Sequence, residues 1–551
     1  MKKTLFMIAA TFFAATAWAQ TVSQAQSEKG FFTNKCNKNQ RKTDLTFMLT
    51  NVLKNHPTSK PSQQPPVTEQ PEGSIINNLY RSTSESYFVG WGSVFSTPID
   101  GFVGTLAKDN NGNIYMEAPF AALNTGTWLK LDKTESDTLV AKGNQPIYQV
   151  DYQGEQIDFY VSRMVTNQTA EGDLTYVIDK QNPDIKFVYR NDSLIQVSDG
   201  IIGMHTVDGK WAEFGDLNSV FSTVKDKVAD INPSLQYNDC YMKFLTSDSQ
   251  DGQLVKLAFD NEDVYIRGAF PNMPEATIIG KKEGNKVVFE SNQYLGIDNV
   301  PKNHAYFFGG TSQKTVDKDG YQQEELFHTK NLTFDFDADK MSLVADSAMC
   351  FNGGNRIMSY IHFFRQPEIN TYTETATTPA MPKIILFYEF NPDEGYATLM
   401  FDYSKFDEQG QFMNPEKLYY KIYKDNEVLT FLPEDYPGLT APTNEMSYNY
   451  DDRQSVLVTE TYHYIQIYED GYSKIGVSCI YKGGGETHES PITWKIIGED
   501  TSVKNFHTDQ IAVSRYLDIS GRRVVNPSQG LFIKEDILTN GTRKYTKVLI
   551  K

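Results

Sequence analysis

The residues of this chain that could carry out catalysis or bind a metal do not group into a recognised motif. No two of the eight histidines lie at metal-ligand spacing: His56, His205, His304, His328, His362, His463, His488 and His507. The patterns of zinc proteases, serine hydrolases, phosphate-binding loops, dinucleotide-binding folds and EF-hands are absent. The sequence therefore predicts no catalytic residue, no cofactor and no metal ligand, while a site assembled from distant strands stays open.

The acidic residues are numerous but carry no diagnostic spacing. Glycoside hydrolysis needs two carboxylates at a set separation in space, and no pair among 70 acids stands out. Asp317–Gly320 and Asp335–Asp339 offer the oxygen ligands that calcium prefers. Neither group ends in the bidentate acid of a known calcium loop, so we interpret both as solvated charge.

The four cysteines are Cys36, Cys240, Cys350 and Cys479, and none forms a Cys-x-x-Cys pair. This spacing argues against zinc and thioredoxin-like chemistry. A disulfide between Cys240 and Cys350 is one alternative, because they lie near the two ends of one predicted domain and export permits disulfides. Buried free thiols are the favoured alternative, since cysteine is among the most buried residue types.

The N-terminus has the pattern of an export signal. Lys2 and Lys3 precede an apolar stretch over residues 4–16, and Ala17-Trp18-Ala19 forms a cleavage site. We expect residues 1–19 to be removed near Ala19 and the protein to be secreted or displayed on the outer cell surface. No later apolar run is long enough for a transmembrane anchor. A net charge of −18 argues against nucleic acid and anionic membranes as partners.

Two segments of the chain resemble each other in order and spacing. After an N-terminal segment and Pro-rich linker at 20–73, we predict one β-domain over 74–232 and a second over 233–371. The matched pieces are Asp100–Leu106 with Asp251–Leu257, Asn113–Phe120 with Asp263–Phe270, Gln145 with Gln293, and Leu174–Val177 with Leu332–Asp335. Short alternating strands broken by Gly, Asn and Asp predict an antiparallel sandwich or open barrel for each copy.

The overall expectation is an all-β chain, with helical spacing confined to a short stretch at 221–228. A third unit over 372–500 contains the strand patterns Lys383–Phe390, Leu418–Tyr423 and Lys474–Tyr481. The last two resemble the middle and final strands of bacterial fibronectin type III-like modules. That resemblance implies an immunoglobulin-like sandwich acting as a spacer or binder.

The last residues, 501–551, resemble the C-terminal sorting domain of the bacterial type IX secretion system. The resemblance rests on Asp518, Gly521, Arg522, Arg523, Gly530, Lys547 and Lys551, and the stretch Glu535–Asn540 departs from it by lengthening the last hairpin. It implies recognition by the export machinery, followed by release or surface attachment. The alternative is a terminal hairpin that completes the neighbouring domain.

Together these features favour an exported or cell-surface binding or adhesion module without catalytic activity, with a glycan or an extracellular protein as ligand. An alternative is a secreted carbohydrate-active hydrolase, which predicts a cleft with two carboxylates about 5–9 Å apart. Another is a structural surface component, which predicts self-association.

Overall fold

Strand-forming sequence dominates the chain, and the computed structural model is correspondingly built from strands. It describes residues 65–550 except 91–92, 135–136, 153–154, 169–173, 247–248, 301, 317–321, 393, 460–461, 498–510, 518–522, 525–529 and 539–542. In these residues the only helix is a single 3₁₀ turn at Pro415–Lys417, so the predicted all-β class is confirmed. None of them forms a helix that is long and apolar enough to cross a membrane.

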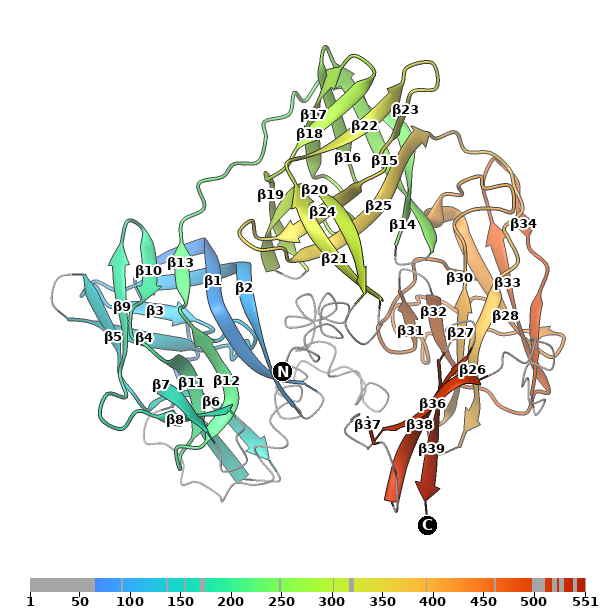
Figure 1. The fold of residues 1–551 in the computed structure, drawn as a ribbon. Helices are drawn as coiled ribbons and strands as arrows, with labels where there is room; N and C mark the ends of the chain where they lie inside the picture. The colour runs from blue at the N-terminus through green and yellow to red at the C-terminus, as the bar shows by residue number, and fades with distance from the viewer. Residues whose placement is uncertain are drawn as a thin grey trace. The chain divides into compact units, whose positions relative to one another are not determined.

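The described residues of the first repeat form strands β1 to β13, which Figure 1 labels. They are β1 (Ser74–Gly90), β2 (Ser93–Lys108), β3 (Ile114–Glu117), β4 (Trp128–Lys133), β5 (Thr138–Ala141), β6 (Gln145–Tyr152), β7 (Glu155–Gln168), β8 (Leu174–Ile178), β9 (Ile185–Arg190), β10 (Ser193–Gln196), β11 (Ile201–Thr206), β12 (Trp211–Leu217) and β13 (Val220–Ser222).

The strand pairings of this repeat close into a ring, which removes open sheet edges along that path. The order is β1-β2-β3-β4-β5-β9-β10-β13, and β13 returns to β1. A second layer leaves the ring at β1 and runs β12-β11-β7, with β6 and β8 both paired to β7. We call this repeat the first barrel. Its ring is closed, whereas the sequence predicts either a sandwich or an open barrel.

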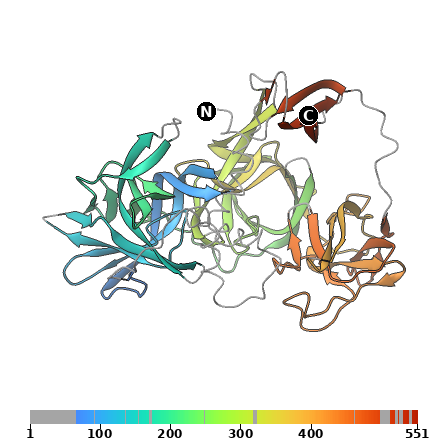
Figure 2. The ribbon, with the colours of Figure 1, turned by 90° about the horizontal axis from the view of Figure 1, so that it is seen from below.

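The second repeat has strands β14 to β25, followed by the third domain. The strands are β14 (Asn238–Leu245), β15 (Gln250–Asp260), β16 (Asp263–Arg267), β17 (Thr277–Glu283), β18 (Lys286–Glu290), β19 (Gln293–Asn299), β20 (Lys302–Val316), β21 (Gln322–Thr329), β22 (Asn331–Asp337), β23 (Ser342–Val344), β24 (Ala348–Gly353) and β25 (Tyr360–Thr371). We call this repeat the second barrel. Figures 1 and 2 show the strands of each repeat curling around their own interior.

The second barrel pairs its strands in the same order as the first. Its ring is β14-β15-β16-β17-β18-β22-β23-β25, and β25 returns to β14. The single strand β25 takes the places of β12 and β13. Because β9 and β22 hold the same place in the two rings, the counterpart of the four residues from Leu332 to Asp335 is the segment from Ile185 to Val188. The alignment of Leu332–Asp335 with Leu174–Val177 was therefore wrong.

The paired glutamines make the same hydrogen bonds in both barrels. Gln145 binds the backbone N–H and C=O of Lys130 at 3.1 and 2.8 Å. Gln293 binds the backbone N–H and C=O of Ile279 at 2.8 and 2.9 Å. In each barrel this side chain clips the fourth strand of the ring, β4 or β17, to the strand that begins at the glutamine. Each barrel also has its own apolar core.

The third domain is built from two sheets that share one core. One sheet has the order β26 (Lys383–Asn391), β27 (Tyr396–Asp402), β32 (Tyr462–Ile467) and β31 (Val456–Val458). The other has β29 (Glu427–Val428), β28 (Leu418–Lys424), β33 (Lys474–Tyr481) and β34 (His488–Glu489), with β30 (Met446–Ser447) on β28 and β35 (Thr493–Ile496) on β33. Phe401 and Ile465 from the first sheet meet Tyr420 and Val477 from the second.

The helix expected at 221–228 does not form. Phe221 lies in β13, where it pairs with Arg81 and Leu194, and residues 223–230 have no regular structure. Burial of Phe221 between two strands outweighs the weak helical spacing around it.

The chain end forms a separate compact unit beginning at Ile496. Its four-stranded antiparallel sheet has the order β37 (Arg523–Val524), β36 (Ile511–Leu517), β38 (Gly530–Leu538) and β39 (Arg543–Ile550). The β38–β39 hairpin pairs from Gly530 opposite Ile550 to Ile537 opposite Arg543, and the described part of the lengthening stretch, from Glu535 to Leu538, continues β38.

The cysteines of the second barrel form no disulfide, and this corrects the bond considered between Cys240 and Cys350. Both thiols are buried and free, as is that of Cys479. Met349 and Phe351 point into the barrel core that contains Cys240, whereas Cys350 packs with Tyr306 on the opposite side of the sheet. Successive strand residues face opposite sides, so the sheet itself separates the two thiols. Cys36 lies outside the described residues.

Candidate binding hollow on the second barrel

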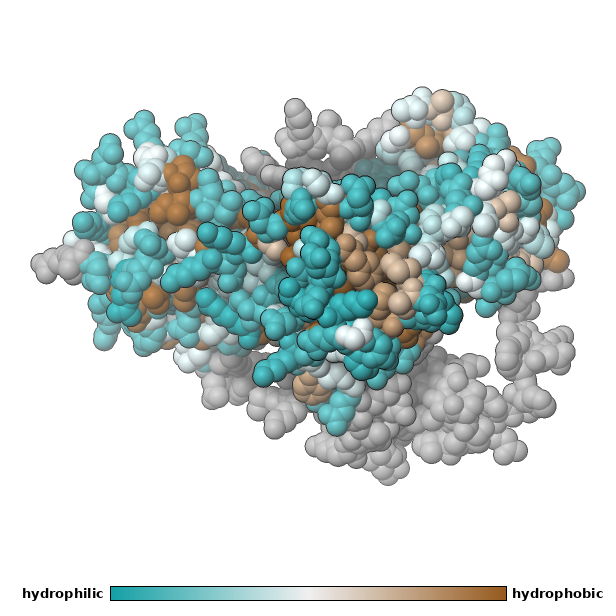
Figure 3. Space-filling model, turned by 90° about the horizontal axis from the view of Figure 1, so that it is seen from above, coloured by the Kyte–Doolittle hydropathy of each residue, from teal (hydrophilic) through white to brown (hydrophobic). Residues whose placement is uncertain are grey.

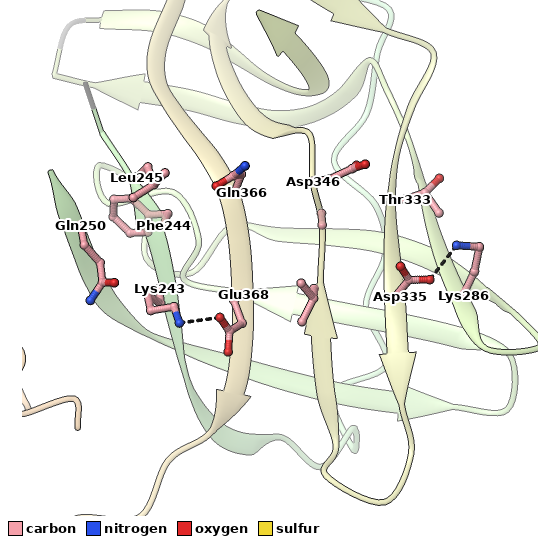
Figure 4. A pocket seen from close by; sticks show the side chains of 12 residues that line it. Lys243, Phe244, Leu245, Gln250, Lys286, Thr333, Asp335, Asp346, Gln366 and Glu368 are labelled. Carbon is pink, nitrogen blue, oxygen red and sulfur yellow. Dashed lines mark hydrogen bonds and ion pairs between the residues drawn. The ribbon is translucent and has the colours of Figure 1, made fainter. Parts of the chain in front are cut away.

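A polar hollow of about 540 Å³ lies on the outer surface of the second barrel. Figure 4 shows the side chains that line it, which come from β14, β15, β18, β22, β25 and the segment that ends β23. Phe334 and Ile369 are buried in the core, so their neighbours on the same strands face outward. The hollow is thus lined mainly by outward-facing side chains that are not part of the barrel core, together with the core residues Phe244 and Ala345.

The floor of the hollow is a straight row of directly opposed residues across five strands. The register places Lys243 opposite Glu368, Glu368 opposite Val344, Val344 opposite Asp335, and Asp335 opposite Lys286. We call these five residues the charged row. Its charges run positive, negative, neutral, negative, positive, so they balance.

The charges of the row are paired with each other. Lys243 binds Glu368, and Lys286 binds Asp335 at 2.6 Å. Burial alone would raise the pKa of Glu368, but hydrogen bonds from Lys243 and Asn370 outweigh burial and lower it. The Glu368 carboxylate therefore stays ionised at neutral pH, and the row offers donors and acceptors without an excess charge.

The first barrel carries a neutral row at the equivalent positions. There the register runs Ser82, Val220, Ile195, Val188 and Thr138. Two copies of one strand pattern therefore differ in all four charges. Because the first barrel closes its ring without them, the charges of the second barrel are not required by the fold.

The backbone bulge beside the row belongs to the fold. Gln366 adopts a left-handed backbone conformation with φ of +47°, which residues other than glycine rarely adopt. Its counterpart Asn218 in the first barrel has φ of +54°. A feature present in both copies is explained by the scaffold, so the strained backbone of Gln366 gives no evidence for a ligand.

The hollow lacks the features of a hydrolase site. A glycosidase needs one carboxyl group that holds a proton near neutral pH, which usually requires a raised pKa. Among the three acids of the hollow, Glu368 has a lowered pKa, Asp335 is paired with lysine, and Asp346 is exposed. Phe244 is the only aromatic lining residue and is 3 % exposed, so it presents no open ring face.

The described histidines do not form a second candidate site. The described residues contain no group of three or more His, Cys, Asp or Glu that could hold a metal ion. His205 bonds Ser162 at 2.9 Å, but both side chains are buried, so no substrate reaches the serine. His463 is buried among aromatic rings of the third domain, where burial lowers its pKa to about 4.

The sorting-like residues are only partly described. Arg523 begins β37, Gly530 begins β38 and Lys547 lies in β39, opposite Ile533. Asp518, Gly521, Arg522 and Lys551 lie outside the described residues, as do the export signal and its cleavage site at Ala19. No sequence motif marked the charged row. A comparison of outward-facing positions in the two repeats would have found it.

No protein-family model matches the chain, and no curated protein matches it in sequence. The function of this protein must therefore be inferred from its own sequence and structure. The face drawn in Figure 3 is largely hydrophilic, with apolar residues in small separate patches. Scattered patches of this kind are normal on protein surfaces and mark no large apolar interface.

Proposed function

We propose that this protein is an exported or cell-surface binding protein whose second barrel holds a neutral, hydroxyl-rich glycan in its outer hollow. The observation that carries the proposal is the charged row, which is present in one copy of the fold and replaced by neutral residues in the other. An arrangement that the scaffold does not require is available for a ligand.

The chemistry of the row favours a neutral glycan over a charged ligand. Each lysine and each carboxylate already has a partner, so a charged ligand would have to break an ion pair. Sugar hydroxyls both donate and accept hydrogen bonds, so they can bind the remaining donors of the two lysines and the remaining acceptors of the two carboxylates without breaking either ion pair. Val344, which is 47 % exposed between the pairs, offers an apolar surface to the C–H face of a sugar ring. The volume falls within the range of small-ligand sites.

Export and surface location are part of the same proposal. They are supported by the signal pattern of residues 1–19 and by the resemblance of 501–551 to type IX sorting domains. N-terminal sequencing of protein from the culture medium or the outer cell surface should give a chain that begins at Gln20. A chain that keeps its first residues, or one found only inside the cell, would contradict this part of the proposal.

The binding test uses a broad glycan array and the mature chain. We expect specific binding that Asp335→Val weakens by at least about tenfold, the loss of one or two good polar contacts. The substitution should leave folding intact, because Val188 occupies the equivalent position in the first barrel. Val188→Asp, which adds the same charge to the first barrel, is the matched control and should bind like the parent protein.

Two outcomes would count against the glycan proposal. One is an array without specific binding, and the other is specific binding that Asp335→Val leaves unchanged. Release of reducing sugar from a mixture of polysaccharides would favour the hydrolase alternative. An array of extracellular matrix proteins, run in parallel, identifies a protein ligand if the glycan array is silent.

A further inference from the structure

One corner of each barrel carries the same three residues at equivalent positions. In the first barrel they are Tyr80, Asp100 and Gly101, and in the second they are Tyr241, Asp251 and Gly252. The tyrosine lies opposite the third residue after the aspartate in both: Tyr80 opposite Val103, and Tyr241 opposite Leu254. We call each set a Tyr–Asp–Gly corner.

The corner of the first barrel contacts the loop after β24 of the second barrel. The Tyr80 hydroxyl donates to Asp100 at 2.7 Å and accepts from the backbone N–H of Asn355 at 2.9 Å. The other Asp100 oxygen accepts from the backbone N–H of Arg356 at 2.7 Å. The Arg356 guanidinium lies 4.7 Å from the centre of the Tyr80 ring. One aromatic ring and one carboxylate thus hold the incoming loop.

The corner of the second barrel contacts the third domain with the same two groups. Asp251 forms an ion pair with Lys405 at 2.9 Å, and the two side chains are only 13 % and 16 % exposed. The Tyr241 ring stacks on Phe412, with centroids 5.1 Å apart and planes 3° from parallel. Again the carboxylate accepts from a nitrogen of the following domain, and the ring packs against one of its side chains.

The glycine of each corner allows close approach of the next domain. A Cβ atom on Gly101 would lie 2.3 Å from the Cα of Gly354. A Cβ atom on Gly252 would lie 2.8 Å from the Phe406 ring. Any larger residue would separate the two surfaces, so the absence of a side chain serves the same purpose in both corners.

We propose that the Tyr–Asp–Gly corner is a docking surface that each barrel uses for the domain that follows it in the chain. Its partner is a loop that presents a nitrogen donor to the carboxylate and a cationic or aromatic side chain to the ring. The two corners arise at the same places in the two copies, although the third domain has a different fold from the barrel that docks on the first corner. The feature the two partners share is this chemistry.

The test is a double-mutant cycle on Asp251 and Lys405 in the mature chain, read by hydrogen exchange of the loop 404–413. Either alanine substitution should speed exchange of this loop by about tenfold, within the usual range of coupling between contacting residues. The double substitution should add little to either single one. Asp239→Ala is the matched control, because it breaks an ion pair with Lys256 on the open surface of the same barrel, where both side chains are more than half exposed.

A charge exchange keeps the test decisive if the single variants unfold. Asp251→Lys combined with Lys405→Asp should restore exchange of the loop to within about threefold of the parent protein. The proposal is overturned if the single alanine variants exchange like Asp239→Ala, or if their effects multiply in the double alanine variant. It is also overturned if the charge-exchange variant fails to restore slow exchange of the loop.

Discussion

The buried ion pair of the first barrel offers the sharpest test of the reasoning. The Arg81 guanidinium lies 2.8 Å from Asp216, with side chains that are 5 % and 0 % exposed. It also donates to the carbonyls of Ala118 and Pro119, each at 2.6 Å. Burial lowers the pKa of Arg81 and raises that of Asp216, and each charge opposes the shift of the other. Each buried charge is therefore stabilised by the opposite charge of its partner.

The second barrel shows what replaces this pair. Its equivalent positions hold Met242 and Phe364, both buried. Gln253 donates to the carbonyls of Gly268 and Ala269, the counterparts of the two that Arg81 binds. The backbone N–H of Ala121 donates to Asp216, but its counterpart in the second barrel is Pro271, which has no N–H to satisfy. Arg81, the two carbonyls that it binds, Asp216 and the N–H of Ala121 are therefore each either replaced or given another partner in the second barrel; the Ser86 hydroxyl, which donates to Asp216 at 2.6 Å, is a further partner in the first barrel.

Arg81→Met alone should destabilise the first barrel by about 3–5 kcal/mol, because it leaves the Asp216 charge buried without its partner. The combined variant carries the full set of second-barrel residues at these positions, Arg81→Met, Phe102→Gln, Ala121→Pro and Asp216→Phe. It should recover more than half of that loss, since a buried pair can be exchanged for well-packed apolar residues at little cost.

The assay is hydrogen exchange at increasing urea concentration, which gives the free energy of opening for each barrel separately. Peptides from β1 to β5 report on the first barrel, and peptides from β14 to β18 serve as an internal reference. Arg190→Met, at an exposed arginine of the same barrel, should change stability by less than about 0.5 kcal/mol. A cost below about 1 kcal/mol for Arg81→Met, or a combined variant less stable than the single one, would refute the reasoning.

Three further predictions concern the buried His463, the partly buried glutamines Gln293 and Gln145, and the buried thiols of the second barrel. Burial holds the pKa of His463 at about 4, so between pH 6.5 and 4 the unfolded chain binds a proton that the folded chain does not. The free energy of unfolding of the third domain should therefore fall by about 3 kcal/mol as pH falls through this range. Thermal unfolding of His463→Gln should show a weaker pH dependence. Gln293→Leu should cost the second barrel about 2–3 kcal/mol, because it removes three hydrogen bonds to backbone groups, and Gln145→Leu should do the same in the first barrel by hydrogen exchange. Burial raises the pKa of Cys240 to about 11 and raises that of Cys350 as well, so neither thiol should react with a thiol reagent before unfolding, and a reductant should leave the melting temperature unchanged.

Much of the architecture could be predicted from local patterns, because strand alternation and turn residues act over a few neighbouring positions. The matched segments at Asp100 and Asp251 place equivalent strands correctly, and Gln145 and Gln293 make the same bonds. The alignment failed for Leu332, because β8 and β9 of the first barrel lie close together in sequence and both resemble β22. Only the pairings of β22 with β18 and of β9 with β5 show that β9, not β8, is equivalent to β22.

The sequence by itself determined the strand content, the two repeated segments and the acidic charge, because each depends on residue type and spacing along the chain. It also predicts the export signal and the sorting-like tail. Tertiary structure decided that each ring closes, that Cys240 and Cys350 face opposite sides of a sheet, and that Lys243, Glu368, Val344, Asp335 and Lys286 form one row. These residues are up to 125 positions apart in sequence, and only the register of strands brought together from across the second barrel places their side chains next to one another.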